Sequence, residues 1–324
     1  MAKRAALSAA PDMAPPLSPA VPPDPAAGDV LVRVRGAVPS LQPAERRVAA
    51  AVVADPAGAA QLSISALAEQ ASTSVTTVMR FCRAIGFTNY PQLRLALAGA
   101  AAREDALGGD RPHGADDIDV HDSLKQIVDK IIYNEARAVQ ETGANLDLDV
   151  LGKAVEAVAA ARRIDIFGVG ASGFVGLDLH QKLHRIGLIA FIWTDPHAAL
   201  TATALLESTD VAIGISHSGA TSDTIEPLQV AARRGARTIA LTNFAASPIT
   251  SSAELVLTTA VRETPFRSGA TASRIAQLAV VDCLFVGVAQ LSYDRAAGAL
   301  SSTHDAIRHR RRYPSATRRT ETGT

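Results

Sequence analysis

Apolar residues follow two different periodicities in the two halves of this 324-residue chain. Residues 38–104 repeat them at helical spacing without a convincing strand, whereas residues 147–292 alternate short β-branched runs with helical stretches. Alternation of the second kind is typical of repeated βαβ units, whose strands form a parallel sheet. The pattern therefore predicts a separate all-α domain followed by an α/β doubly wound parallel sheet.

The segments around these blocks differ in composition. Seven prolines between Pro11 and Pro25 disfavour helix and sheet, so residues 1–37 are expected to be a disordered tail. Residues 105–121 are rich in Gly and Asp and are expected to form a linker. Residues 293–324 contain a run of arginines with little apolar content, which predicts a basic, disordered second tail.

An amphipathic helix is predicted at residues 122–142, between the linker and the α/β block. Its apolar stripe repeats every three to four positions and consists of Leu124, Ile127, Val128, Ile131 and Ile132. We expect the stripe to pack on the α/β domain or on a second subunit. This helix leads the α/β domain, which is assigned to residues 122–292.

Composition narrows the class of protein further. The formal net charge is zero, so any affinity for nucleic acid must come from a local basic patch. No uninterrupted apolar run reaches the roughly 18 residues that a membrane span needs, so a cytoplasmic protein without a membrane partner is expected. Cys82 and Cys283 lack the spacing of a zinc site or redox pair and are expected to be buried thiols.

Two short helices with a tight connection are predicted inside the all-α block. The first covers residues 62–70, and Ser74 is placed to cap a second helix from Val75 to Ala84 that ends at Gly86. Helical spacing turns one set of the second helix's residues toward the core, namely Val75, Val78, Met79 and Cys82. It leaves another set outside, namely Thr76, Thr77, Arg80 and Arg83.

This pair of helices has the geometry of a helix-turn-helix, whose second helix enters the major groove of double-stranded DNA. Hydroxyls can contact phosphates or base edges, and arginine can pair with guanine. The candidate DNA-binding residues are Ser74, Thr76, Thr77, Arg80 and Arg83. Spacing alone fits a structural helical bundle equally well.

A resemblance changes that balance. The stretch Ser74-x-x-Thr77-Val78-x-Arg80-Phe81-Cys82-Arg83-x-x-Gly86-Phe87, preceded by Ile64-x-x-Leu67-Ala68, is similar to the helix-turn-helix of RpiR-type transcriptional regulators. The flanking stretches from Leu41 to Val48 and from Tyr90 to Leu93 are similar to that family's neighbouring helices. Thr73-Ser74 departs from the family's frequent Val-Ser pair but keeps the capping serine. The resemblance implies an operator as the partner.

Two loops of the α/β block follow buried strands. After residues 163–167 comes Gly168-Val169-Gly170-Ala171-Ser172-Gly173, a turn that lets backbone amides approach an anion at a helix start. The spacing also permits a dinucleotide site, but no persuasive acidic residue ends the next strand, because Asp195 stands before Pro196 at another helix.

The second loop carries the sharper signal. The strand Val211 to Ile215 ends in Ser216-His217-Ser218-Gly219-Ala220-Thr221. Ligands of open α/β sheets bind beyond the carboxyl ends of the strands, and hydroxyls with free amides suit a phosphate monoester there. The alternative is that these hydroxyls only satisfy the loop and cap its helix, although a cap explains one hydroxyl rather than three.

Residues 124–292 resemble a sugar isomerase (SIS) domain. The matching stretches are both loops, Lys182 to Gly187, Ala240 to Asn243, Ser247-Pro248-Ile249, and Ser273-Arg274-Ile275-Ala276-Gln277-Leu278, the last typical of regulators. The resemblance implies phosphate contacts from the second loop, a sugar-facing Ser172, and an approach of Glu263 and Arg267 to the ligand. The residues predicted to bind the sugar phosphate are Gly170, Ala171, Ser172, Ser216, His217, Ser218, Gly219, Thr221 and Glu263.

SIS domains serve isomerases as well as regulators. Isomerisation needs an acid and a base, and no pair stands out among Glu226, Glu263 and His217. His180 and His184 have zinc-like spacing without a third ligand, so a partly buried helix face explains them better. We therefore expect a sugar-phosphate-modulated DNA-binding regulator, not an enzyme, without cofactor or metal, as a homodimer or homotetramer. A phosphosugar isomerase with a helical extension is the alternative.

Overall fold

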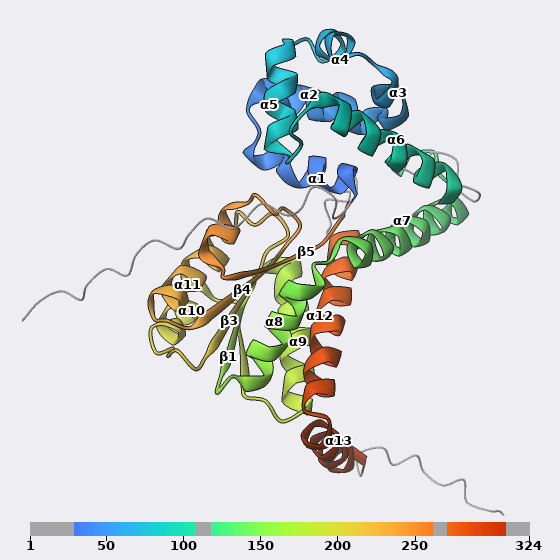
Figure 1. Cartoon of the computed structure of the whole chain (residues 1–324). Helices are drawn as coiled ribbons and strands as arrows, with labels where there is room; N and C mark the ends of the chain where they lie inside the picture. The colour runs from blue at the N-terminus through green and yellow to red at the C-terminus, as the bar shows by residue number, and fades with distance from the viewer. Residues whose placement is uncertain (1–28, 108–117, 262–270, 309–324) are drawn as a thin grey trace, which may run out of the picture.

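The computed structural model describes residues 29–107, 118–261 and 271–308. Figure 1 shows a helical N-terminal domain standing on one end of an α/β domain. The N-terminal elements are α1 (Val30–Ala37), the short 3-10 helix η1 (Val38–Ser40), α2 (Pro43–Ala54), α3 (Pro56–Gln61), α4 (Ile64–Gln70), α5 (Val75–Ala84) and α6 (Tyr90–Leu107).

Helix α1 corrects the prediction that residues 1–37 form a disordered tail. The prolines end at Pro25, and the Asp29 side chain caps the new helix by accepting from the Leu31 amide at 2.7 Å. Four α1 side chains lie in the domain core, namely Val30, Leu31, Val34 and Ala37. The proline-rich segment ends before Asp29, so the predicted disordered tail wrongly included a helix cap and the apolar stripe of α1.

The α/β domain has a five-stranded sheet in the order β2-β1-β3-β4-β5, in which every neighbouring pair is parallel. This confirms the predicted doubly wound parallel sheet. Its elements are α7 (Leu124–Asn145), α8 (Leu148–Ala160), β1 (Ile164–Phe167), α9 (Gly170–Arg185), β2 (Ala190–Trp193), α10 (Pro196–Thr203), β3 (Val211–Ile215), α11 (Ser222–Arg233), β4 (Arg237–Thr242), η3 (Pro248–Ser252), β5 (Leu255–Thr258), α12 (Thr271–Leu291) and α13 (Tyr293–Arg308).

Helices cover both faces of this sheet, as Figure 1 shows. Helices α8, α9 and α12 share one core with the strand side chains of one face, including Ile164, Ile166 and Ile213. Helices α10 and α11 pack on the other face around Phe167, Ala212 and Leu228. The strands are buried on both sides, which explains why their sequences are continuous apolar runs.

Helix α12 is long and apolar enough, by length and composition, to cross a membrane, with a mean hydropathy of 1.6 over its best window. The sequence predicted no such segment. In this fold α12 contacts α7, α8 and α9. Its buried face consists of Ala272, Ser273, Ala276, Gln277, Val280, Val281, Leu284 and Val288. We interpret α12 as the central helix of the α/β domain, for which an apolar sequence is equally suited.

The predicted helix at residues 122–142 is α7, with Ser123 as its cap. Its second half packs on α12, where Ala138 joins Val261, Ala272 and Ala276 in a small cluster. Its first half keeps part of the predicted stripe exposed: Leu124 is 82%, Val128 59% and Ile132 63% accessible. Packing of this part on the chain's own α/β domain is therefore wrong, and packing on a second subunit stays a prediction.

Helix α13 corrects the second predicted tail over residues 293–308. Its Ala296 is buried and Leu300 packs against the same core, so two apolar side chains one turn apart hold the helix. The arginine-rich composition hid this spacing. Most of the basic run lies outside the described residues.

Candidate functional site

The two predicted ligand loops lie at the topological switch point of the sheet. Strand β1 pairs with β3, and Phe167 at the end of β1 lies opposite Gly214 of β3. The helices that follow these two strands, α9 and α11, pack on opposite faces. In an open α/β sheet the chain diverges at such a point and leaves a crevice beyond the strand ends. The loops after β1 and β3 lie at this point of the sheet, where ligands of open α/β sheets bind.

The β1–α9 turn is built so that backbone comes close to backbone. A Cβ on Gly168 would lie 3.0 Å from the Ser172 carbonyl oxygen, and one on Gly173 would lie 3.0 Å from that of Gly168. Gly170, the first residue of α9, has φ +58°, a left-handed conformation that favours glycine. Helix α9 therefore begins directly at the strand end, where its first amides carry partial positive charge.

Ser172 lies in the first turn of α9 with 9% of its surface accessible. Its Oγ donates to Oε1 of Gln277 on α12 over 3.4 Å. Gln277 is 1% accessible, and its Nε2 lacks a hydrogen-bond partner among the described residues. The predicted sugar-facing serine is thus joined to a buried amide whose role the sequence analysis missed.

The hydroxyls of the β3–α11 loop organise it from within. Ser216 Oγ lies 3.1 Å from Thr221 Oγ1 and accepts from the Gly219 amide at 3.1 Å. Ser218 Oγ accepts from the Ala220 amide at 3.2 Å, and Ser218 itself is exposed. Both serines therefore have roles within the loop, as the alternative explanation requires. Hydroxyls retain further acceptor and donor capacity beyond one such bond.

The strand next to this loop fixes its conformation. The His217 carbonyl oxygen accepts from the Asn243 amide at 3.0 Å and from Thr242 Oγ1 at 3.2 Å. Gly219 has φ +62°, and a Cβ there would collide with the Ser247 side chain. Thr242, Asn243 and Ser247 are supporting residues that the sequence analysis quoted without a role. Polar side chains directly after a buried strand were the available signal.

The predicted second helix of the helix-turn-helix is α5. The Ser74 hydroxyl accepts from the Thr77 amide at 3.2 Å, which confirms it as the cap, and Gly86 after the helix has φ +79°. Thr76, Arg80 and Arg83 are exposed as predicted, but Thr77 is 7% accessible and faces the core. Ser74 also contacts Thr77, their hydroxyls lying 3.1 Å apart.

Val75, which the spacing placed in the core, is exposed, and Phe81, to which the spacing gave no place, is buried instead. Val75 is 41% accessible, whereas Phe81 is fully buried with Val78 and Cys82. The buried face of α5 is therefore rotated by part of a turn from the predicted one, and it begins at Thr77 instead of at the first helical residue. Exposed Val75 stands beside Thr76, where an apolar side chain can contact a thymine methyl.

Two arginines are held by residues outside the two predicted helices. Arg80 Nε lies 3.1 Å from Oε1 of Glu45, a residue of α2 that is 7% accessible. Arg47 of α2 donates to the carbonyl oxygens of Ala71 and Ser72, at 3.1 and 3.0 Å. Ser72 has φ +48°. Arg47 thus fixes the turn between α4 and α5, a role without a local sequence signal.

The other residues that the sequence suggested as candidates are not assigned to either site by the structure. Glu263 and Arg267 lie outside the described residues. Glu226 is exposed on α11, and Asp195 caps α10 by accepting from the Ala198 amide at 2.8 Å. The rings of His180 and His184 are tilted by 43° with their centroids 4.6 Å apart, and no group of three potential metal ligands occurs in the described part of the chain.

The prediction of two buried thiols is wrong for one cysteine. Cys82 is buried, but Cys283 is exposed on α12. Cysteine spacing does not indicate which face of a helix a thiol occupies, and Cys283 lies on the side of α12 that faces solvent.

Comparison with known proteins places both domains. Residues 28–104 match a helix-turn-helix domain of the rpiR family, and residues 157–287 match a SIS domain. A curated HTH-type transcriptional regulator of Caldanaerobacter subterraneus is 37% identical over 87% of this chain and 98% of its own length. The chain belongs to the RpiR family of transcriptional regulators.

Further similar proteins agree with this assignment. The HTH-type regulator YbbH of Bacillus subtilis is 33% identical over 84% of this chain and 94% of its own length. The structure of Vibrio vulnificus NanR complexed with ManNAc-6P covers 86% of this chain and 98% of NanR, with a TM-score of 0.55 and 29% identity. The sugar isomerase domain of an RpiR transcription factor from Sphaerobacter thermophilus covers 56% of this chain and 99% of its own, with a TM-score of 0.52 and 28% identity.

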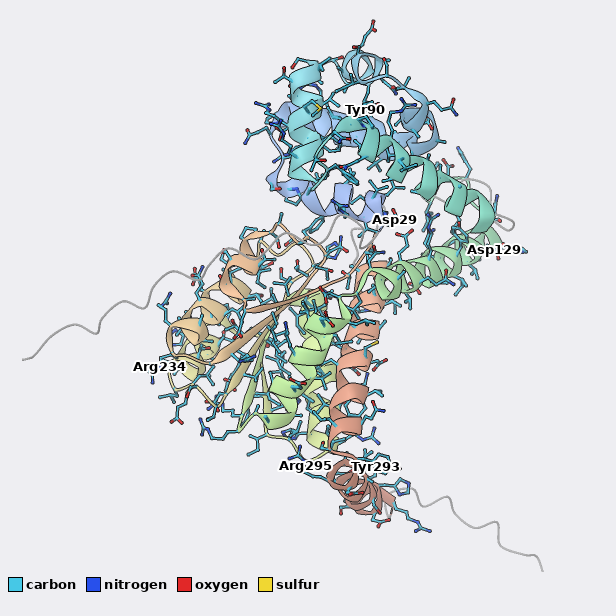
Figure 2. All side chains as sticks on the ribbon, viewed as in Figure 1. Asp29, Tyr90, Asp129, Arg234, Tyr293 and Arg295 are labelled. Carbon is cyan, nitrogen blue, oxygen red and sulfur yellow. The ribbon has the colours of Figure 1, made fainter. Side chains whose placement is uncertain are left out.

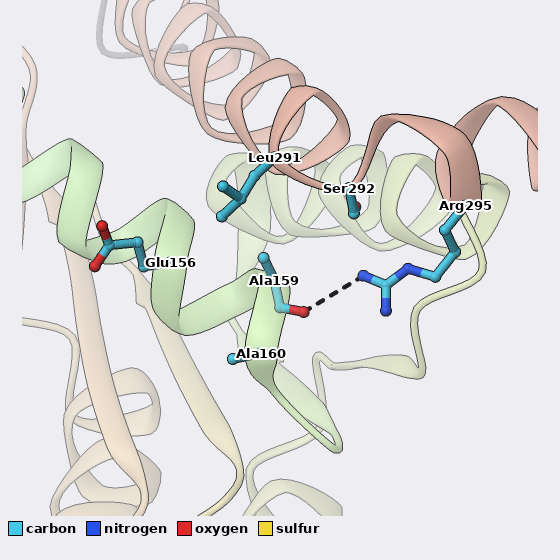
Figure 3. A pocket seen from close by; sticks show the side chains of 6 residues that line it. All are labelled: Glu156, Ala159, Ala160, Leu291, Ser292 and Arg295. Atoms are coloured by element: carbon cyan, nitrogen blue, oxygen red, sulfur yellow. Dashed lines mark hydrogen bonds between the residues drawn. The ribbon is translucent and has the colours of Figure 1, made fainter.

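A separate hollow of about 450 Å³ lies at the opposite edge of the sheet. It is lined by Glu156, Ala159, Ala160, Leu291, Ser292 and Arg295, and Arg295 Nη2 donates to the Ala159 carbonyl oxygen at 3.4 Å (Figure 3). Ala160 ends α8 just before β1 begins, so this hollow lies away from the two ligand loops.

Proposed function

We propose that this RpiR-family regulator binds an operator through α5 and that a sugar phosphate bound by its SIS domain modulates this affinity. The observation that carries the proposal is the pair of loops at the switch point, Gly168–Gly173 and Ser216–Thr221, within a family of transcriptional regulators. A related protein of the same architecture, NanR, is described as complexed with ManNAc-6P.

The chemistry of the loops suits a phosphate monoester. The Ser216, Ser218 and Thr221 hydroxyls, with the amides at the start of α11, would hold the phosphate oxygens. Gly219 has no side chain that would keep the phosphate away from the backbone. Ser172, Ala171 and Gly170 at the start of α9 would face the sugar. In this proposal Glu263, after β5, completes the site.

A short hydrogen-bonded route leads from the phosphate loop to the DNA-binding domain. Asn243, whose amide donates to His217, accepts from the Val261 amide at 2.8 Å through its Oδ1. The adjoining Ala260 amide donates to Oγ1 of Thr142, a residue of α7 that is 2% accessible. A ligand that moves the loop would thereby act on α7.

Helix α1 supplies the last step of this route. Arg35 of α1 pairs with Glu141 of α7 at 3.2 Å. The amide of Asp29, which lies near the junction of the two domains (Figure 2), donates to Asn145 Oδ1 at 2.6 Å. On its other side α1 reaches the end of α5, because Arg33 donates to the Ile85 carbonyl oxygen and lies over the Phe87 ring. The recognition helix and the SIS domain therefore share one intermediary.

Paired recognition helices in a homodimer would meet successive major grooves about 34–36 Å apart. A sugar phosphate that shifts α7 would change this spacing. In this proposal the second subunit packs on the exposed apolar stripe at the start of α7, which includes Val128.

Reciprocal linkage tests the proposal. Sugar-phosphate affinity is measured by titration with and without operator DNA, using a panel of hexose 6-phosphates that includes ManNAc-6P. If the two sites are coupled, the operator must change ligand affinity by the same factor by which ligand changes operator affinity, typically about 5–150-fold. Identical ligand affinities in the two titrations would refute the coupling.

A further inference from the structure

The pair Ser172 and Gln277 stands out among the buried polar groups of the SIS domain. Gln277 is the seventh residue of α12, a helix that packs against α9. Its Oε1 accepts the long 3.4 Å bond from Ser172, while its Nε2 is buried without a partner among the described residues. Buried polar atoms in folded proteins are nearly always hydrogen-bonded, so an exception calls for an explanation.

A purely structural bridge between α12 and α9 explains this arrangement poorly. Such a bridge needs only the carbonyl oxygen of the side chain, and a methionine of similar volume would fill the space without an unsatisfied amide. The buried amide instead lies next to Ser172, in the first turn of the helix that follows the β1 loop. An oxygen acceptor arriving at this position would satisfy it.

We propose that Gln277 is a specificity-determining residue, whose Nε2 donates to a hydroxyl or carbonyl oxygen on the sugar part of the ligand, beside Ser172. This inference rests on the proposed function, because it assigns the sugar end of the same site. In this proposal the β3–α11 loop binds the phosphate that all sugar phosphates share. The Ser172–Gln277 pair distinguishes one sugar from another. A site built to hydrogen-bond a hydroxyl rejects analogues that lack it.

The ligand-free protein provides a first test. Gln277→Met removes an unsatisfied buried amide and keeps the volume, so its thermal midpoint should be no lower than that of the unsubstituted chain. Gln290→Met, at an exposed position of the same helix, is the matched control. A clear fall in the midpoint for Gln277→Met alone would show that the amide is structural and would overturn the proposal.

The deciding test compares sugar phosphates with their singly deoxygenated analogues, with inorganic phosphate as the probe of the phosphate loop. Gln277→Met should weaken binding of the preferred sugar phosphate about tenfold or more, while it leaves inorganic phosphate and the analogue that lacks the contacted oxygen within about twofold. Gln277→Asn, which withdraws the amide by one carbon, should show the same pattern and replaces the first variant if that one fails to fold.

The contrary outcomes are distinguishable. An equal loss for every sugar phosphate and for inorganic phosphate, or no loss at all, would overturn the role of Gln277 and leave the proposed function intact. Failure of the unsubstituted chain to bind any sugar phosphate or inorganic phosphate would overturn the proposed function itself, and the role of Gln277 with it.

Discussion

Arg35 and Glu141 join the two domains by an ion pair, in which Arg35 Nη2 lies 3.2 Å from Glu141 Oε2. The two side chains are only 14% and 18% accessible, so solvent screens their attraction less than at an open surface. Arg35 belongs to a helix of the DNA-binding core, and Glu141 lies one residue before Thr142, which bonds to the chain after β5. The pair therefore lies where a movement of the SIS domain would reach the DNA-binding domain.

Breaking this pair should uncouple the domains without disabling either. We expect Arg35→Met to leave operator affinity and sugar-phosphate affinity nearly unchanged when each is measured alone. The factor by which one ligand changes the affinity of the other should fall toward one. Titration of a sugar phosphate with and without operator measures this factor.

Two further variants control that experiment. Lys125→Gln removes the ion pair with Asp129, which spans 2.7 Å at the exposed start of the same helix, and should leave the coupling intact. The exchanged pair Arg35→Glu with Glu141→Arg should restore part of the coupling. A full ligand response in Arg35→Met would mean that the signal takes another route.

Removing the loop hydroxyls should abolish the response to sugar phosphate. Ser216→Ala with Ser218→Ala deletes two hydroxyls of the β3–α11 loop, and DNA binding in the absence of ligand should survive because both hydroxyls bond within their own loop. A thermal-shift assay is the direct measurement, since a ligand at 100 times its dissociation constant stabilises by roughly 2.7 kcal/mol. Ser251→Ala, at an exposed serine of η3, is the control. An undiminished shift in the double variant would remove the phosphate assignment.

Helices and strands could be predicted from the sequence more completely than individual long-range contacts could. The strand Val211–Ile215 and the capped helix from Val75 were predicted because a buried parallel strand and an N-cap leave local patterns. Arg47 and Gln277 act on residues 24 and 105 positions away, and spacing within a window does not record such contacts. Helix α1 was missed for a different reason, because proline-rich composition was weighed above the cap at Asp29.

Arg80 should contribute to operator binding in a way that depends on Glu45. The side chain is 55% accessible on α5, and its Nε is paired with the nearly buried Glu45 carboxylate, which restricts its rotamers before DNA arrives. Arg80→Ala should cost on the order of 1–3 kcal/mol of operator binding if the guanidinium reads a base. Gel-shift titrations against the operator and an unrelated duplex measure the loss and its sequence dependence.

Glu45→Gln separates orientation from charge at the same position. It keeps the arginine but weakens its partner, so we expect a smaller loss of specificity and no loss of non-specific affinity. Sugar-phosphate affinity should be unaffected in both variants. An equal loss on both duplexes for Arg80→Ala would assign Arg80 to phosphate contact instead of base reading.

The free energy of unfolding should fall as the pH is lowered from neutral to mildly acidic, in part because of His180. Burial lowers the pKa of His180, and the neighbouring His184 lowers it further. The neutral form is thus favoured in the folded chain, whereas the unfolded chain takes up a proton near pH 6.5. The contribution is complete above that pH and is lost as pH falls toward the folded pKa. Urea unfolding at pH 7.5 and 5.5 should show a smaller difference for His180→Gln than for the control His197→Gln, at an exposed histidine; equal differences would contradict this assignment.

The two cysteines should differ sharply in reactivity. Burial raises the pKa of Cys82 to about 11, and its side chain faces the core of the DNA-binding domain, whereas Cys283 is exposed on α12. Because the thiolate is the nucleophile, a buried thiol with a raised pKa reacts slowly. N-ethylmaleimide at pH 7 should therefore modify Cys283 alone in the native protein and both cysteines in denaturant, as peptide mass mapping can establish. Native labelling of Cys82 at a comparable rate would show that α5 separates from its core on the timescale of the reaction, and the recognition helix would then be a mobile element instead of a rigid one.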